Sequence, residues 1–204
     1  TINLFNLNEP GLRMYKDSRG WSQEQYERKI AWTALQIDSL KADVLAFQEL
    51  WHAKSLNEAF NQSSMAGGYQ LLVPPDATGK KITCAAAVRQ GIPVESVEWI
   101  EDFPDSFVLS SSGGDAQTPG ISVAIKGFSR PVLHARVKLH PKEPPVHLYV
   151  CHFKSKGPTD LFRESWYNKE VHGPHHAALG AAVSTIRRTA EAAAMRVILN
   201  LAMK

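Results

Sequence analysis

Hydrophobic residues in the first third of the chain follow strand spacing and helix spacing in turn. Residues 2–7 form a short strand pattern. Tyr26, Ile30, Thr33, Ile37 and Leu40 then recur every three or four positions. This spacing predicts an amphipathic helix from near Gln23 to about Lys41, with Ser22 as its N-cap. The apolar run Val44–Gln48 predicts a strand covered on both faces, and a second helix is predicted from about Ser55 to Met65.

The middle of the chain has the pattern of several strands separated by proline and glycine. The candidate strands are Tyr69–Val73, Thr83–Val88, Val94–Ile100, Ile121–Ile125, Val132–Leu139 and Val146–Phe153. The polar stretch Ser110–Gly120 is predicted to be a mobile loop, and a long amphipathic helix is predicted after Pro174. This order of elements predicts an α/β (α+β) fold with a sheet packed under helices, in a single domain over residues 1–204.

Composition and charge exclude several classes of protein. The 204 residues are 44% hydrophobic with a net charge of +3, which is typical of a globular domain. No apolar stretch reaches the roughly 18 residues of a membrane helix, and no dense basic block demands nucleic acid as a partner. The N-terminus lacks the pattern of a signal peptide, so a cytoplasmic location is favoured, while a processed N-terminus leaves export open. Cys84 and Cys151 lie in apolar runs and are predicted to be free thiols.

Glu49 is the first candidate for chemistry because it follows directly on the apolar run Val44–Gln48. A carboxylate at the end of a buried strand projects to the edge of the sheet, where ligands of α/β proteins commonly bind. One or two carboxylates with several waters suit Mg²⁺. The alternative is a solvated glutamate that begins a loop.

Asn6 and Asn8 are the second pair of candidates. Asparagine is poor in strand interiors, so Asn6 in the first strand needs a reason. Its amide oxygen could bind a hard cation or orient the carboxylate that does. Turn initiation before Glu9 is the alternative, and it explains Asn8 better than Asn6.

His152 is the third candidate, in a strand pattern that places it on one face with Val150 and Lys154. A histidine beside lysines could act as a general acid or contact a phosphate near neutral pH, or it could simply be hydrogen-bonded. His172, His175 and His176 form a separate cluster that could bind a metal, but the intervening Gly-Pro favours a loop without fixed geometry.

Three ordered segments resemble the endonuclease/exonuclease/phosphatase superfamily, which has the deoxyribonuclease I-like fold. They are Leu4-Phe5-Asn6-Leu7-Asn8, Ala42-Asp43-Val44-Leu45-Ala46-Phe47-Gln48-Glu49-Leu50 and Val150-Cys151-His152-Phe153-Lys154-Ser155-Lys156. Ala85-Ala86-Ala87-Val88-Arg89 and the helix at 187–199 add weaker similarity. The segment that contains Gln48-Glu49 is the most specific of the set.

The resemblance implies a four-layered sandwich and a metal-dependent phosphoesterase that hydrolyses phosphodiesters or phosphomonoesters. Mg²⁺ is the implied metal, with Mn²⁺ as the alternative. Glu49 and Asn6 would hold the metal and act in catalysis together with His152, while Lys154 and Asn8 would bind substrate. The family's substrates include DNA, RNA, inositol phosphates and sphingomyelin, so nucleic acid is one expected partner among several.

The chain also departs from the family pattern. The family's later Gly-Asp-x-Asn and Ser-Asp-His motifs are missing, and Gly114-Asp115 lies too early and continues Ala116-Gln117. We therefore expect a C-terminally incomplete domain that lacks the last part of its second sheet and has little activity alone. Such a domain could self-associate through an exposed sheet edge. The alternative is a non-catalytic binding domain with a degenerate site, and the reading frame after Lys204 would discriminate the two.

Overall fold

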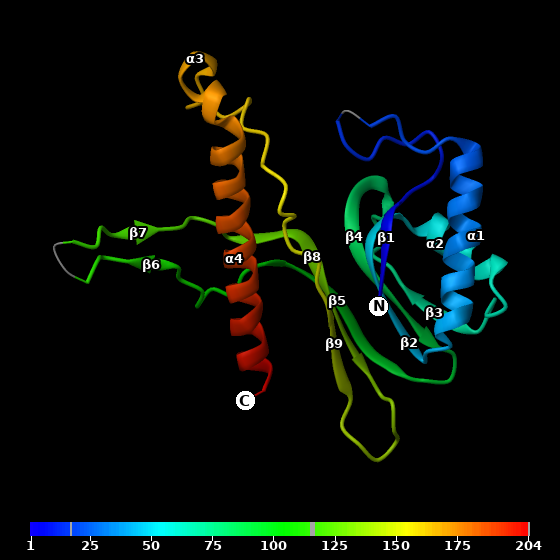
Figure 1. Cartoon of the computed structure of the whole chain (residues 1–204). Coiled ribbons are helices and arrows are strands. Elements are labelled where there is room, and N and C mark those ends of the chain that lie inside the picture. Colours follow the sequence, from blue (N-terminus) through cyan, green and yellow to red (C-terminus); the bar gives the residue numbers. More distant parts are fainter. Residues whose placement is uncertain (17, 115–116, 204) are drawn as a thin grey trace. The chain divides into compact units, whose positions relative to one another are not determined.

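The computed structural model describes residues 1–16, 18–114 and 117–203 (Figure 1). The chain divides into two compact units. The first contains Thr1–Ile100 and Arg130–His152, and the second contains Glu101–Ser129 and Phe153–Lys204. A single domain over residues 1–204 stays a prediction.

The first unit is built on a four-stranded sheet with the order β1-β2-β4-β3. Its strands are β1 (Ile2–Leu7), β2 (Val44–His52), β4 (Thr78–Arg89) and β3 (Tyr69–Leu72). β1 and β2 pair in parallel, whereas β4 pairs antiparallel with both β2 and β3. β1 is an edge strand of this sheet, and self-association through such an edge stays a prediction.

Two helices, α1 (Gln23–Leu40) and α2 (Ala53–Gln62), pack against this sheet (Figure 1). The predicted start of α1 is confirmed, because the side chain of Ser22 accepts from the backbone N–H of Gln25 while Gln25 Oε1 accepts from the N–H of Ser22. Tyr26, Ile30 and Ile37 are buried on the sheet side of α1. The helical spacing read from the sequence therefore identifies the buried stripe except at its last position, because Leu40 is 45% exposed.

A second sheet covers the other face of the first, with the order β5-β8-β9. Its strands are β5 (Val94–Asp102), β8 (Gly127–Val137) and β9 (Val146–Val150). Leu45 and Phe47 of β2 lie in the core under the helices, whereas Val44 and Ala46 pack into the core between the sheets. The prediction that this run is covered on both faces is confirmed.

The second unit contains the short strands β6 (Ser110–Ser111) and β7 (Ile121–Ser122), the helix α3 (Lys169–His172), a 3₁₀ turn (Gly173–His175) and the helix α4 (His176–Ala202). The long helix after Pro174 is confirmed. The strand predicted at Ile121–Ile125 is shorter than expected, and the loop predicted at Ser110–Gly120 contains β6. Asp115 and Ala116 lie outside the described residues.

A buried glutamate fastens α4 within the second unit. Glu191 is fully buried, and its Oε1 and Oε2 accept from the backbone N–H groups of Ser129 and Lys154 at 2.8 and 2.6 Å. Ala190 and Ala194 on either side of it pack against Phe103. A buried carboxylate is tolerated where such charge-assisted hydrogen bonds replace water.

The coarse fold class is thus confirmed as mixed α and β, while the four-layered sandwich stays a prediction. Both cysteines are free thiols, as predicted, and burial raises the pKa of Cys84 to about 12 and that of Cys151 to about 11. Within the described ranges, no helix has both the length and the hydrophobicity needed to cross a membrane.

Candidate functional site

The candidate residues of the first unit meet where β1 and β2 both depart from regular geometry. The parallel register shifts between Asn3 and Leu7, and the register of β2 with β4 shifts between Phe47 and Leu50. Asn6 and Glu49 lie at these irregularities with φ of 58° and 60°. The left-handed region is costly for non-glycine residues, and such conformations gather at functional sites. The two irregularities therefore make this region a candidate functional site.

The carboxylate of Glu49 is held by donors on both oxygens. Oε1 accepts from Asn3 Nδ2 at 2.9 Å, and Oε2 accepts from the backbone N–H of Asn6 at 3.1 Å. His152 Nε2 lies 3.5 Å from Oε1. The side chains of Glu49 and His152 each retain 18% exposure, so the carboxylate is oriented by the protein and still reached by solvent.

Asn6 is fixed by three donors from outside its strand. Its Oδ1 accepts from the Tyr15 hydroxyl at 2.9 Å and from Trp51 Nε1 at 3.0 Å, and its carbonyl oxygen accepts from Trp21 Nε1 at 2.8 Å. Two hydrogen bonds occupy the capacity of an amide oxygen. Asn6 therefore orients Glu49 through its backbone N–H, and its amide oxygen is already engaged.

Electrostatically, Glu49 interacts with Tyr15 and Lys29. The pKa of the Tyr15 phenol is raised, mainly by burial and then by the charge of Glu49, while Arg130 acts in the opposite direction as a cation and hydrogen-bond partner. Burial lowers the pKa of the Lys29 ammonium, and Glu49 partly offsets this effect. Two cations therefore lie at this site. Lys29 is near the carboxylate of Glu49, and Arg130 is near the hydroxyl of Tyr15.

Aromatic rings flank the same place. Lys29 Nζ lies 5.3 Å from the ring centroids of both Phe5 and Trp21, within cation–π range. Tyr15 packs edge-on against Trp51 with centroids 5.3 Å apart. Phe5, whose ring lies near Lys29 and Trp21, is 66% exposed and offers an apolar surface to solvent.

His152 reaches Glu49 from outside a strand, which corrects one expectation. β9 ends at Val150, so the predicted strand Val146–Phe153 is too long and its alternation does not extend to His152 and Lys154. The run of apolar and polar residues continues past Val150, but the ladder of β9 with β8 ends at the pair Leu133 and Val150. The sequence pattern could not show where the partner strand stops.

The two predicted substrate-binding residues take different positions. Asn8 is fully buried, and it donates to the carbonyl of Gly79 at 3.3 Å while its Oδ1 accepts from the N–H of Glu9 at 3.0 Å. Lys154 belongs to the second unit, where its backbone N–H contacts Glu191. The structure thus brings together Asn6, Glu49 and His152, and it gives Asn8 hydrogen bonds inside the core.

Among the three histidines near Pro174, His172 and His176 have separate hydrogen-bond partners. His172 Nδ1 accepts from the N–H of Asn168 at 2.7 Å, while His176 stacks on Phe162 at 4.2 Å and its Nε2 accepts from the N–H of Leu161 at 3.3 Å. Across the part of the chain that the structure describes, no three His, Cys, Asp or Glu side chains form a group that could hold a metal. A metal at Glu49 would therefore rely on water for its other ligands.

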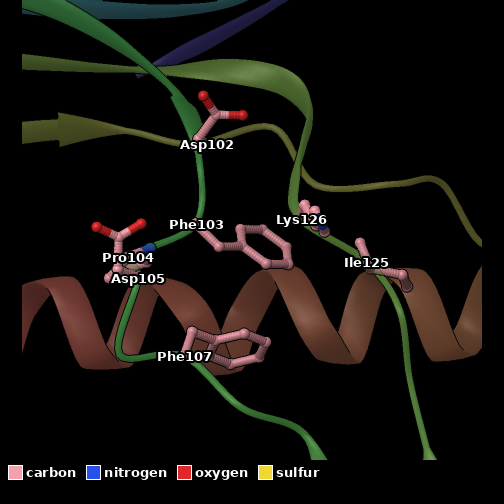
Figure 2. A pocket seen from close by; sticks show the side chains of 7 residues that line it. All are labelled: Asp102, Phe103, Pro104, Asp105, Phe107, Ile125 and Lys126. Atoms are coloured by element: carbon pink, nitrogen blue, oxygen red, sulfur yellow. The ribbon is translucent and has the colours of Figure 1, made fainter.

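The second unit contains a cavity of about 470 Å³ (Figure 2). It is lined by Asp102, Phe103, Pro104, Asp105, Phe107, Ile125 and Lys126. The two carboxylates point away from the two phenyl rings in Figure 2, and the rings contact each other edge-on with centroids 5.0 Å apart. None of the residues predicted to act in catalysis or metal binding lines this cavity.

Comparison of the chain with protein-family models, with curated proteins and with solved structures finds no match. Membership of the endonuclease/exonuclease/phosphatase superfamily therefore stays a prediction from the ordered sequence motifs.

Proposed function

We propose that the chain belongs to a divalent-metal-dependent phosphoesterase of the deoxyribonuclease I-like type, with Glu49 as the metal ligand. The observation that carries the proposal is the Glu49 carboxylate, which Asn3 and Asn6 orient and which lies 3.5 Å from His152. These residues come from three segments far apart in the sequence, and three of them, Glu49, Asn6 and His152, are those that the family resemblance selects. The proposed fold is the four-layered sandwich of that family.

The residues at this place fit a hard cation bound through Glu49. Mg²⁺ takes one or two carboxylates and keeps several waters, and the partly exposed Glu49 meets that requirement. A cation at Asn6 Oδ1 would have to displace the hydroxyl of Tyr15 or the indole N–H of Trp51. Glu49 is therefore the primary ligand, and Asn6 supports it by holding Oε2. When bound, Mg²⁺ or Mn²⁺ would polarise a phosphoryl oxygen and offset developing negative charge.

The surrounding side chains supply the remaining functions. His152 is placed to hold or transfer a proton, or to donate to a phosphoryl oxygen, through Nε2. Arg130 and Lys29 are cations suited to an anionic phosphoester, and a guanidinium can bind two phosphate oxygens at once. Asn8 supports the end of β1 from within the core, and the part of Lys154 in substrate binding stays a prediction from the sequence.

The proposal is tested by phosphoester hydrolysis with Mg²⁺, measured on the protein made from the complete reading frame that contains this chain. Bis-p-nitrophenyl phosphate and plasmid DNA are the probes. Glu49→Gln should reduce turnover at least about a hundredfold, since it removes the charge that would hold the metal ion. Glu24→Gln is the matched control, because Glu24 is a glutamate on α1 with 80% exposure.

Each outcome decides between the two functional classes. Mg²⁺-dependent turnover that is lost in Glu49→Gln and kept in Glu24→Gln supports the phosphoesterase. Wild-type turnover in Glu49→Gln contradicts the assignment of Glu49. Binding of DNA without hydrolysis by the wild-type protein would instead favour a non-catalytic binding domain.

A further inference from the structure

We propose that a histidine pair on the second sheet is a binding site for a divalent transition-metal ion, separate from the site at Glu49. His134 lies on β8 and His147 on β9, and Nε2 of His134 is 3.0 Å from Nδ1 of His147. The strand register pairs His134 with Tyr149 and Arg136 with His147. The two histidines are thus diagonal neighbours on one face of the sheet, within reach of each other.

A carboxylate and an aromatic ring fix the orientation of His134. Its Nδ1 lies 2.8 Å from Oε1 of Glu98, and its ring is parallel to Tyr149 with centroids 4.3 Å apart. A carboxylate at one ring nitrogen holds the proton there and leaves a lone pair on the other nitrogen, as behind metal-bound histidines. With this tautomer, Nε2 of His134 accepts a hydrogen bond from Nδ1 of His147. A metal ion would take the place of that shared proton, and neutral His147 would then keep its proton on Nε2.

The separation of the two ring nitrogens suits a shared metal ion. With metal–nitrogen bonds of about 2.0–2.1 Å, two ligands at a right angle would lie about 2.9 Å apart and two tetrahedral ligands about 3.4 Å apart. The observed 3.0 Å lies between these values, close to the right-angle arrangement. His147 is exposed, so its ring can turn slightly to aim Nδ1 at the ion, and water can fill the remaining positions.

The charges around the pair favour a cation of the imidazole-binding kind. Glu98 carries one negative charge beside His134, and the guanidinium of Arg136, opposite His147, is engaged by Glu95 at 2.9 Å. Two imidazoles select Cu²⁺, Ni²⁺ or Zn²⁺ over Mg²⁺, which prefers oxygen ligands. The histidine pair should therefore prefer these transition metals, whereas the site at Glu49 should prefer Mg²⁺.

Isothermal titration calorimetry of the 204-residue chain with Cu²⁺, Ni²⁺ and Zn²⁺ tests the proposal. One ion should bind, and the Kd should rise at least about tenfold in His147→Gln and in His134→Gln. Glu98→Gln should also weaken binding, by roughly 10–100-fold, as is typical when a carboxylate behind a metal-bound histidine is removed. His147 is exposed, so its variant should stay folded even if the His134 variant does not.

Two controls separate this site from the other metal-binding candidates. His140→Gln removes an exposed histidine after β8 and should leave the Kd unchanged, as should replacement of His172, His175 and His176 by glutamine. Absence of binding would overturn the proposal, and so would binding that survives His147→Gln but is lost when the three later histidines are replaced. Unchanged binding in Glu49→Gln would show that the two sites are independent.

Discussion

The backbone N–H of Asn6 donates to Oε2 of Glu49 over 3.1 Å, and both residues have a left-handed backbone conformation. Neither residue is glycine, and both lie where the strands lose register, directly before the pair Leu7 and Leu50. Irregular pairing of this kind re-aims a side chain at the end of a sheet. The bond joins β1 to β2 at the point where Glu49 turns toward His152.

Glu49→Gly and Glu49→Ala provide a test of this strain. Both substitutions remove the carboxylate, but alanine keeps the Cβ that disfavours a φ of 60°, and glycine does not. We expect Glu49→Gly to be more stable than Glu49→Ala by about 1 kcal/mol. Urea denaturation followed by tryptophan fluorescence measures the difference. Equal stabilities would mean that Glu49 is unstrained in solution.

Asn6→Ala removes an acceptor that two side chains share. The indole of Trp51 is buried, and it would lose its hydrogen bond together with the hydroxyl of Tyr15. We expect a loss of about 1–3 kcal/mol in the free energy of unfolding, with a change in tryptophan emission. Asn6→Asp keeps an acceptor oxygen and should lose less, so a larger loss in Asn6→Asp would contradict this role of Oδ1.

Glu191→Ala should destabilise the second unit through its backbone. The substitution removes the acceptor for the N–H groups of Ser129 and Lys154, at a cost of about 1–3 kcal/mol for each group. Amide hydrogen exchange should accelerate at both positions. Glu191→Gln keeps one acceptor oxygen and should have a smaller effect, while exposed Glu164→Ala is the control. Unchanged exchange at Ser129 and Lys154 would contradict this anchoring role.

The raised pKa of Tyr26 predicts how the free energy of unfolding changes at alkaline pH. Burial raises its pKa to about 12 from 10.0, and its hydroxyl donates to Glu58 Oε2 at 2.8 Å. Between these two pH values the unfolded chain loses the phenol proton while the folded chain keeps it. Stability should therefore be constant below pH 10 on this account and fall as the pH rises toward 12.

The measurement for Tyr26 is a spectrophotometric titration of tyrosinate together with unfolding at each pH. In Tyr26→Phe, a component of the tyrosinate titration near pH 12 should disappear and the fall in stability should flatten. A titration curve that is the same in Tyr26→Phe and wild type, apart from its amplitude, would show that Tyr26 ionises like an ordinary tyrosine.

Local signals in the sequence predicted much of the fold. Ser22 and Gln25 sit three residues apart, and a capping box needs only that spacing, so the start of α1 was legible. The run at β2 is apolar because both of its faces are covered, and its residues divide between two cores as that pattern requires. These features depend on neighbouring residues alone.

The candidate site could be predicted only in part from the sequence, because it is formed by segments that are distant along the chain. Glu49, Asn6 and His152 could be selected, but Asn3, Tyr15, Trp51 and Arg130 carry no local motif that points to them. The left-handed conformations of Asn6 and Glu49 have no glycine to mark them. The end of β9 at Val150 is set by its pairing with β8, which the spacing of His152 and Lys154 does not encode.

The most direct test of the central claim is Mn²⁺ binding at Glu49, followed by the electron paramagnetic resonance signal of free Mn²⁺ in titrations of the 204-residue chain. Mn²⁺ accepts the same oxygen ligands as Mg²⁺ and reports binding without any need for turnover. The account predicts one Mn²⁺ that Mg²⁺ displaces, with a Kd at least about tenfold higher in Glu49→Gln and unchanged in Glu24→Gln. Mn²⁺ binding that is the same in Glu49→Gln as in the wild-type chain would contradict it.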